Sequence, residues 1–232
     1  MRRILSLETS TSVCSVALHQ EGNLKFVSEI HEDQAHAGKL SPLIEHALNL
    51  LGWEADSLDA VAVSGGPGSY TGLRIGTSTA KGLCLALNIP LIAVDSLKVM
   101  ASYVSKLNVS DGHLCPMLDA RRMEVYCSLY TSQLDTVSLV QALVIEPGAF
   151  EEILAKNKVF FFGPGAEKCV GVIAHPNASF IHGIYPSARD LGELATASFD
   201  RGEVQDLMAF EPLYLKEFLV KKSTKLERVL NK

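Results

Sequence analysis

The sequence predicts an α/β protein built from two related halves, each with a mixed sheet flanked by helices. In residues 1–107, strand patterns and helical patterns follow one another in the order βββαβαβα. Two features of this first half then recur, in the same order, in the second half. We therefore expect one subdomain over residues 1–108 and a second, degenerate copy of it over residues 109–232.

The predicted strands of the first half are short and apolar. The first three form a meander, because they are rich in valine or alternate with polar residues and are separated by short polar turns. The last two are continuous apolar runs, which are typical of buried strands. These strands cover residues 3–9, 12–19, 24–30, 60–64 and 89–94.

Helical spacing separates these strands. Apolar residues recur every three or four positions from Leu40 to Leu51, which predicts a helix with one apolar face that ends at Gly52. Its start is open: Ser41 and Pro42 suit the N-cap and first helical position, while a start one turn earlier, near His36, fits equally. A second helix is expected over residues 72–88 and a third over 96–107, where Asp95 is a candidate N-cap.

The repeated features argue for an internal duplication. The first is an apolar strand, an acidic residue (Glu8 or Asp119), a polar turn and a strand with a Cys-Ser pair. The second is a buried strand that ends in Gly-Pro-Gly. The matching pairs are residues 4–18 with 116–130 and residues 61–69 with 159–167. The second copy lacks the long helix that joins these two features in the first.

Composition excludes several classes of protein. The net charge of −5 counts against a protein that binds nucleic acid alone, although residues 216–232 are basic and are interpreted as a solvated tail or last helix. No apolar run is long enough to cross a membrane, and no signal peptide is recognisable, so we expect a cytoplasmic protein. The five cysteines form no CxxC pair and each lies in an apolar run, which predicts reduced core residues.

A glycine-rich segment, 64-SGGPGSYTGLRIG-76, joins a predicted strand to a predicted helix as phosphate-binding loops do. It matches neither common fingerprint: Gly72 is followed by Leu73 and by no lysine until Lys81, and the glycine spacing is one residue too long for GxGxxG. Free amides at the start of the helix leave anion binding open. The favoured interpretation is structural, a tight turn and close packing, and it involves Gly65, Gly66, Gly68, Gly72 and Gly76.

The helix that follows carries two rows of small residues at four-residue spacing. One row is Gly72, Gly76 and Ala80, and the other is Ser78, Gly82 and Ala86. Small residues allow another backbone to approach closely, and each glycine costs about 1 kcal/mol of helix propensity relative to alanine. One row must meet the sheet of the same subdomain. On spacing alone the other row fits a neighbouring helix of the chain, with a partner protein as the alternative.

These segments identify a family. The N-terminal ILSLETSTSVCSVAL, the glycine segment with its small-residue helix, and 212-PLYLKE-217 together resemble the TsaB (YeaZ) family. The resemblance implies an actin-like ATPase fold of the sugar kinase and Hsp70 superfamily, with two related subdomains. It also implies a non-catalytic protein that pairs with TsaD, the subunit that transfers threonylcarbamoyl from its adenylate to N6 of adenosine 37 in tRNA.

The resemblance also implies further partners. The small ATPase TsaE joins the pair, family members form homodimers through the same helical surface, and tRNA is met only through the complex. ATP and metal are expected to belong to the partner subunits. The catalytic paralogue holds its metal with an HxxxH motif, and none occurs among the seven histidines here. We therefore expect no catalytic residue, no metal and no cofactor in the isolated chain.

Two acidic residues are candidate remnants of a nucleotide and magnesium site. Glu8 stands where actin-like kinases place an acid at the end of the first strand, and Asp119 is its counterpart in the second copy. Carboxylates on opposed strands can hold hydrated Mg²⁺. The favoured interpretation is that each caps its own turn through the backbone.

The partner is expected to dock on the helices over 36–51 and 72–88. His36 is interpreted as an exposed polar residue near a helix start, with partner contact as the alternative. The candidate interface comprises His36, Leu40, Leu43, Ile44, Ala47, Arg74, Ile75, Ser78, Thr79, Lys81 and Gly82. The competing hypotheses are a stand-alone actin-like kinase or ATPase that depends on Glu8, and a glycoprotease, for which neither HExxH nor GxSxG is present.

Overall fold

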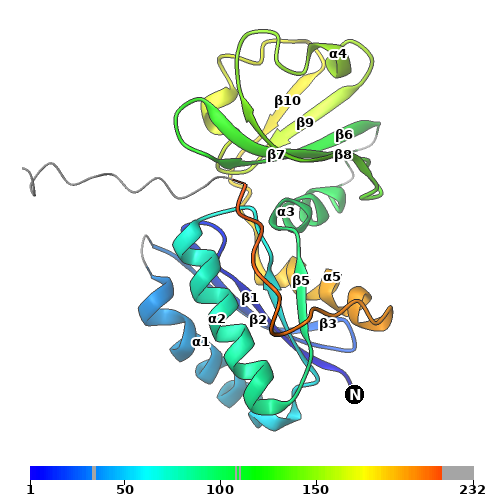
Figure 1. The fold of residues 1–232 in the computed structure, drawn as a ribbon. Coiled ribbons are helices and arrows are strands. Elements are labelled where there is room, and N and C mark those ends of the chain that lie inside the picture. The colour runs from blue at the N-terminus through cyan, green and yellow to red at the C-terminus, as the bar shows by residue number, and fades with distance from the viewer. Residues whose placement is uncertain (33–34, 108, 110, 216–232) are drawn as a thin grey trace, which may run out of the picture.

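Two five-stranded mixed sheets form the framework of the molecule (Figure 1). The computed structural model describes residues 1–32, 35–107, 109 and 111–215. The first sheet has the order β3-β2-β1-β4-β5 and the second β10-β9-β6-β7-β8. The strands of the first are β1 (Arg3–Glu8), β2 (Val13–Gln20), β3 (Asn23–His31), β4 (Ala60–Ser64) and β5 (Leu91–Val94). Those of the second are β6 (Gly112–Asp119), β7 (Glu124–Tyr130), β8 (Thr136–Val144), β9 (Lys158–Phe162) and β10 (Ala178–Ile181).

The two sheets have the same topology. In the first, β1 pairs antiparallel with β2 and parallel with β4, while β3 and β5 form the two edges. In the second, β6 pairs antiparallel with β7 and parallel with β9, while β8 and β10 form the edges. Each half therefore contains a three-stranded meander extended by two parallel strands. The duplication expected from the sequence is confirmed.

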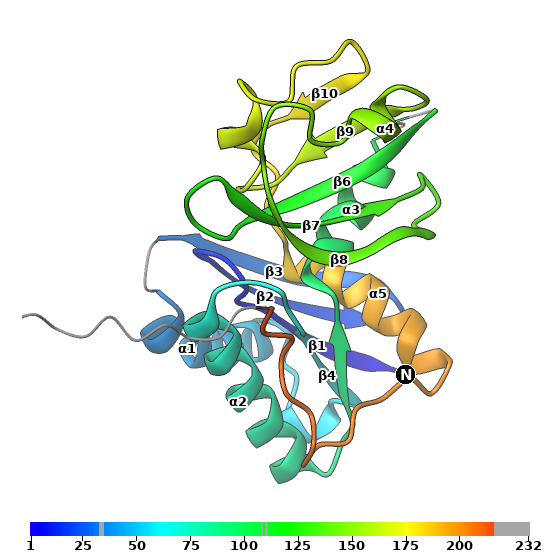
Figure 2. The same cartoon turned by 45° about the horizontal axis from the view of Figure 1, so that its top comes forward.

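Helices cover both faces of the first sheet (Figures 1 and 2). α1 (His36–Leu51) and α2 (Tyr70–Leu87) lie side by side on one face, and α5 (Ala188–Asp200) lies on the other. α3 (Ser96–Ser105) packs on the second sheet. The second copy has only α4 (Glu151–Leu154) before its parallel strand, as expected, and the short 3₁₀ helices are η1 (Ala55–Ser57) and η2 (Glu167–Cys169).

Alternation along β1 distributes its side chains between two cores. Leu5 and Leu7 point toward α1 and α2 and join a core that includes Leu40. Ile4 points to the opposite face and packs with Leu191 of α5. A strand with helices on both faces is expected to be apolar on both, which explains why this run is apolar apart from Ser6, a small polar residue that is also buried.

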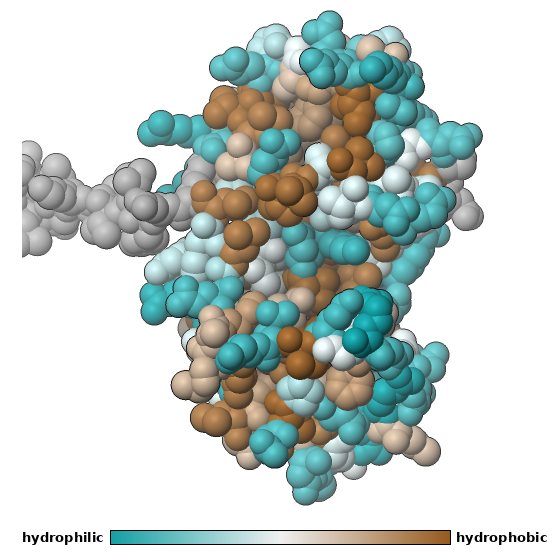
Figure 3. Space-filling model, turned by 45° about the vertical axis from the view of Figure 1, so that its right-hand side comes forward, coloured by the Kyte–Doolittle hydropathy of each residue, from teal (hydrophilic) through white to brown (hydrophobic). Residues whose placement is uncertain are grey.

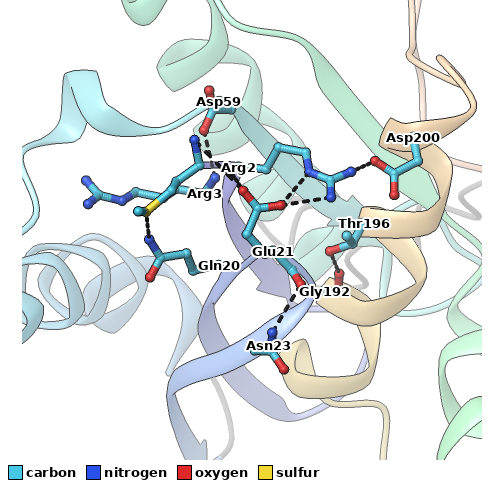
Figure 4. A network of polar contacts seen from close by, with 10 residues as sticks. Arg2, Arg3, Gln20, Glu21, Asn23, Asp59, Gly192, Thr196 and Asp200 are labelled. Atoms are coloured by element: carbon cyan, nitrogen blue, oxygen red, sulfur yellow. Dashed lines mark hydrogen bonds and ion pairs between the residues drawn. The ribbon is translucent and has the colours of Figure 1, made fainter.

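The packing crosses the expected subdomain boundary at residue 108. α3 precedes the boundary in the chain but buries Leu97 and Met100 against the second sheet. α5 follows it but packs on the first sheet, and Arg2 near the N-terminus forms ion pairs with Glu21 and with Asp200 of α5 (Figure 4). A boundary at residue 108 therefore divides the chain in sequence only, because each half supplies a helix to the sheet of the other half. The boundary itself remains a proposal.

Helix ends follow local chemistry. α1 begins at His36, the earlier of the two expected starts, and Pro42 lies inside its first two turns. It ends at Gly52, whose φ of 62° and ψ of 34° are left-handed. The Asp95 carboxylate accepts hydrogen bonds from the amides of Leu97 and Lys98, which confirms it as the N-cap of α3.

The surface is mixed in character. No helix of the described residues is long and apolar enough to cross a membrane. All five cysteines are free and buried, as expected. On the face drawn in Figure 3, hydrophobic side chains gather over the half that holds the second sheet. The edge strand β8 exposes Val137, Leu139 and Val144.

Candidate functional site

The glycine segment packs directly onto the turn between β1 and β2. The Ser69 amide donates a hydrogen bond of 2.7 Å to the Ser10 carbonyl oxygen, which ties the loop to that turn. The Ser69 hydroxyl accepts one of 3.2 Å from the Gly72 amide and so caps α2. Two amides that an anion would need at this helix start are therefore already used within the protein.

Three of the glycines are required for this approach. A Cβ on Gly68 would overlap the Ser10 carbonyl, and a Cβ on Gly72 or Gly76 would overlap Thr9. Gly66 serves a second contact, because its φ is 94° and a Cβ there would lie 2.7 Å from the Leu213 carbonyl oxygen. Gly65 differs, since a Cβ there would make contacts of 3.4 Å or more.

The second copy repeats this contact. The Gly165 amide donates a 2.9 Å hydrogen bond to the Met117 carbonyl oxygen of β6. A Cβ on Gly165 would lie 2.6 Å from the Leu118 carbonyl carbon. In both halves, then, the Gly-Pro-Gly turn after the fourth strand packs on the end of the first strand. The glycines serve this packing, which is the structural interpretation favoured by the sequence.

Glu8 lies buried at the end of β1. Its Oε1 accepts a 2.6 Å hydrogen bond from the Ser10 amide, and its Oε2 accepts one from the Ser64 hydroxyl. Burial raises the pKa of the Glu8 carboxyl above its ordinary value of 4.5, and the bonds from both serines oppose this rise. Both carboxylate oxygens are thus engaged by the protein itself.

Asp119 occupies the equivalent position in the second copy but is exposed. Its Oδ1 accepts a 2.8 Å hydrogen bond from the Arg121 amide and also pairs with Lys168. Each acid therefore bonds the backbone two residues further along, as a turn cap does. Among the described residues, no group of three or more His, Cys, Asp or Glu side chains is placed to hold a metal ion.

Part of the candidate interface on α1 faces the core instead. Leu40, Ile44 and Ala47 are buried against the first sheet, so they are not available to a partner. His36 is also buried, and its Nε2 lies 3.2 Å from the Val13 carbonyl oxygen. The expectation of an exposed His36 was wrong, because α1 starts at this residue and its first turn covers β2. Leu43 is partly buried.

The two small-residue rows of α2 face opposite ways. Gly72, Gly76 and Ala80 face the β1–β2 turn and the core, while Ser78, Gly82 and Ala86 are exposed. No atom would lie within 4 Å of a Cβ on Gly82. Arg74 is exposed as well, and Ile75 and Thr79 are partly buried. The outer row is therefore not covered by a neighbouring helix of the described chain, contrary to the favoured intramolecular interpretation.

Two exposed leucines on α1 and α2 were missed by sequence analysis. Leu85 of α2 is 72% exposed and Leu50 of α1 is 60% exposed. We define the outer helical face by Leu50, Ser78, Gly82, Leu85 and Ala86. The signal that could have found Leu50 and Leu85 is their departure from the three- and four-residue spacing of the core positions.

Lys81 is engaged within the chain. Its Nζ donates to the carbonyl oxygens of Phe210, at 3.1 Å, and Met208, at 3.4 Å. Its side chain therefore holds the C-terminal segment on α2, which sequence analysis did not foresee. The same segment crosses the ends of β4 and β5, where Gly65, Asp95 and Tyr214 help to line an open cavity of about 540 Å³. Burial raises the pKa of the Asp95 carboxyl.

Comparison with known proteins identifies the family. Residues 29–226 match the family model described as TsaD, tRNA N6-adenosine threonylcarbamoyltransferase. The Escherichia coli tRNA threonylcarbamoyladenosine biosynthesis protein TsaB is 30% identical over 92% of this chain and 94% of its own length. The chain belongs to the TsaB family. The relative of the same name from Haemophilus influenzae is 27% identical over 92% of this chain and 93% of its own length.

Solved structures of the family agree with this assignment. A structure from Pseudomonas aeruginosa, described as similar to peptidase YEAZ, superposes with a TM-score of 0.82. It is 30% identical and covers 93% of this chain and all of its own. YeaZ from the same organism gives a TM-score of 0.78 at 29% identity, with the same coverage. The two like subdomains are the actin-like arrangement that the resemblance implied, and the fold class is confirmed.

Proposed function

We propose that this TsaB-family chain is a non-catalytic subunit that pairs with TsaD for threonylcarbamoyl transfer to N6 of adenosine 37 in tRNA. The observation that carries the proposal is the outer helical face on α1 and α2. Its residues are exposed, the three that form the row on α2 are small, and two of its members are exposed leucines. Such a surface fits a helix pair of another protein better than a small molecule.

The chemistry of this face suits helix docking. Ser78, Gly82 and Ala86 lie one turn apart, so a second helix can approach the α2 backbone closely. Burying an exposed leucine side chain stabilises a complex by roughly 1.5–3 kcal/mol. Leu50 on α1 and Leu85 on α2 offer exposed apolar area of this kind. Close backbone contact and apolar burial together give a reason for a glycine at this exposed helical position.

The glycine segment supports a binding role over catalysis. Its amides and its close contacts serve packing on the β1–β2 turn, and both carboxylate oxygens of Glu8 accept hydrogen bonds from Ser10 and Ser64. A stand-alone kinase would need these groups free for phosphate and magnesium. We therefore assign ATP and metal to the partner subunits, with TsaE as a third component.

The choice of TsaD as the partner rests on sequence similarity. The family model that this chain matches carries the name of the transferase, so this chain and TsaD are expected to share a fold. Related chains can associate through equivalent surfaces in a pseudo-two-fold arrangement, as two identical chains do in an isologous dimer. The same outer helical face therefore also serves a homodimer, which competes with the heterodimer.

A substitution on the outer row tests the proposal. Gly82→Arg places a long charged side chain on that row, and Gly171→Arg is the matched control, because a Cβ at either glycine meets no atom within 4 Å. Gly82→Arg should remain folded, since arginine favours helix over glycine by about 1 kcal/mol. It should weaken association with TsaD at least about tenfold, which corresponds to about 1.4 kcal/mol.

The measurement is size-exclusion chromatography with light scattering on each variant mixed with TsaD. Wild type and Gly171→Arg should give the mass of a one-to-one complex, and Gly82→Arg should give separate components. If Gly82→Arg associates as well as the control does, the partner does not bind the outer helical face and the proposal fails.

A further inference from the structure

The turn between β6 and β7 has an unusual backbone for its residue types. Arg121 and Arg122 follow one another with φ values of 70° and 52°, both in the left-handed region. Glycine and asparagine adopt this region easily, whereas a longer side chain there is strained. The hairpin closes around them, because the Ala120 amide bonds the Glu124 carbonyl oxygen at 3.0 Å.

Other residue types would adopt this turn with less backbone strain. Hairpin turns with successive positive φ values are usually built from Asn-Gly or Asp-Gly. Strained positions that persist tend to serve function. Here the strain displays two guanidinium groups: Arg121 and Arg122 are exposed, and no ion pair joins either one to another described residue. Packing does not account for these two residue types.

Neighbouring residues hold the turn in place, and their charges pair with each other, not with the two arginines. Asp119 fixes the turn by accepting the Arg121 amide, while its charge is balanced by Lys168. Lys168 also donates to the Glu124 carbonyl oxygen at 2.7 Å, which ties η2 to the hairpin. The two arginines therefore project from a hairpin that is braced on both strands.

The turn shares its side of the molecule with the start of α2 and with the end of the described chain. In both ribbon views, the β6–β7 turn, the N-terminal end of α2 and the end of the described chain lie on the same side of the molecule (Figures 1 and 2). The α2 end carries Tyr70 and exposed Arg74, and the Tyr70 ring lies 4.9 Å from that of Tyr214.

From this arrangement we infer that the Arg121–Arg122 turn binds backbone phosphates of the tRNA substrate when the chain is in its complex. Guanidinium groups match phosphate geometry in pairs of parallel hydrogen bonds. Aromatic rings beside such a site stack on unpaired bases. Because the chain has a net charge of −5, it is not expected to bind RNA over a large surface. The contact at the turn would therefore add to RNA binding by the partner. The inference rests on the proposed function, which supplies RNA as the substrate.

The turn sequence itself provides the test. Arg121→Asn with Arg122→Gly removes both positive charges and installs residues that suit positive φ, so the melting temperature should stay the same or rise. The control removes two charges elsewhere on the surface, by Lys25→Gln with Lys156→Gln. Arg74 is left unchanged, because it also belongs to the candidate partner interface.

RNA affinity is measured by fluorescence anisotropy of the assembled complex, with an unmodified tRNA transcript that carries adenosine at position 37. The turn variant should lose about five- to twentyfold in affinity near 0.15 M salt, and its slope of log K against log salt should fall by about one to two. The control should lose much less and keep its slope within about half a unit.

Light scattering on the same samples separates the two proposals. Equal tRNA affinity of turn variant and wild type overturns the phosphate contact and leaves the subunit function standing. Loss of complex formation by the turn variant also overturns it, because the turn would then be a protein contact. If wild type does not associate with TsaD, the subunit function fails, and the same titration on the free chain still decides whether the turn binds RNA.

Discussion

Glu8 shows how one residue type can mark a site without performing its chemistry. At the end of the first strand an acid suits magnesium in a kinase, and here the same acid is buried and satisfied by Ser10 and Ser64. Burial favours the neutral form, so the folded protein holds this proton more tightly than the unfolded chain does. The contribution of this proton to the free energy of unfolding is fully present below about pH 4.5, and it is lost as the pH rises through the pKa that Glu8 has in the folded protein.

Replacement of Glu8 should therefore change the pH dependence of stability. Glu8→Gln removes the titration, so the free energy of unfolding of wild type should fall relative to the variant as the pH rises from about 4 to 7. Urea unfolding at several pH values measures this difference. The matched control is Asp119→Asn, at the exposed counterpart in the second copy. A constant difference between Glu8→Gln and wild type across that range would show that Glu8 does not titrate as the buried geometry requires.

At the scale of the element, α2 has three distinct sides. The row from Gly72 to Ala80 meets the β1–β2 turn, the row from Ser78 to Ala86 faces solvent, and Lys81 holds the C-terminal segment. The segment is further fixed by the Leu213 amide, which donates a 2.8 Å hydrogen bond to the Gly65 carbonyl oxygen. One helix thus links the glycine turn, the proposed partner surface and the last described residues.

Loss of the Lys81 ammonium should loosen the C-terminal segment. Lys81→Met keeps the aliphatic stem and removes the donor to Phe210 and Met208, which costs about 1 kcal/mol locally. Amide hydrogen exchange of residues 206–213 should then be about fivefold faster, while the core strands stay protected. Lys39→Met, on the exposed side of α1, is the control. Unchanged exchange in this segment would mean that Lys81 does not hold it.

At the scale of the molecule, the two subdomains are joined by an exchange of helices. α3 packs on the second sheet and α5 on the first, and Lys106 at the end of α3 pairs with Asp190, at 2.9 Å, and Glu193, at 2.5 Å, on α5. Asp190 is only 4% exposed, and burial raises the pKa of its carboxyl. This ion cluster therefore lies where the two halves meet.

Removing the cation should weaken the junction between the halves. Lys106→Met leaves Asp190 buried without its counter-charge, which should cost about 1–3 kcal/mol, since Lys106 itself is partly exposed and screened. Lys106→Met combined with Asp190→Asn should recover most of that loss, because no uncompensated charge remains. Urea unfolding of both variants and of Asp190→Asn measures the coupling. A double variant as unstable as the sum of the two single variants would show that the pair is not coupled.

Local patterns in the sequence were sufficient for the architecture. Strand runs, turn chemistry, the glycine stop of α1 and the Asp95 cap are set by residues close together in the chain, so their positions follow from propensity and capping. The duplication was also visible, because the two copies keep the same order of features. The spacing of the glycine segment fits no phosphate motif, and the structural interpretation drawn from it agrees with the close contacts at Gly68, Gly72 and Gly76.

The facing of the helices and the path of the chain end were decided only by tertiary structure. An apolar helical row predicts burial without saying what covers it, so Leu40, Ile44 and Ala47 were assigned to a partner although the first sheet covers them. The two small rows of α2 are alike in sequence, and only the position of Thr9 makes one of them the inner row. The contacts of Lys81 with the C-terminal segment and of α5 with β1 join residues more than a hundred positions apart. No local propensity encodes such contacts, because they depend on how the completed sheets bring distant segments together.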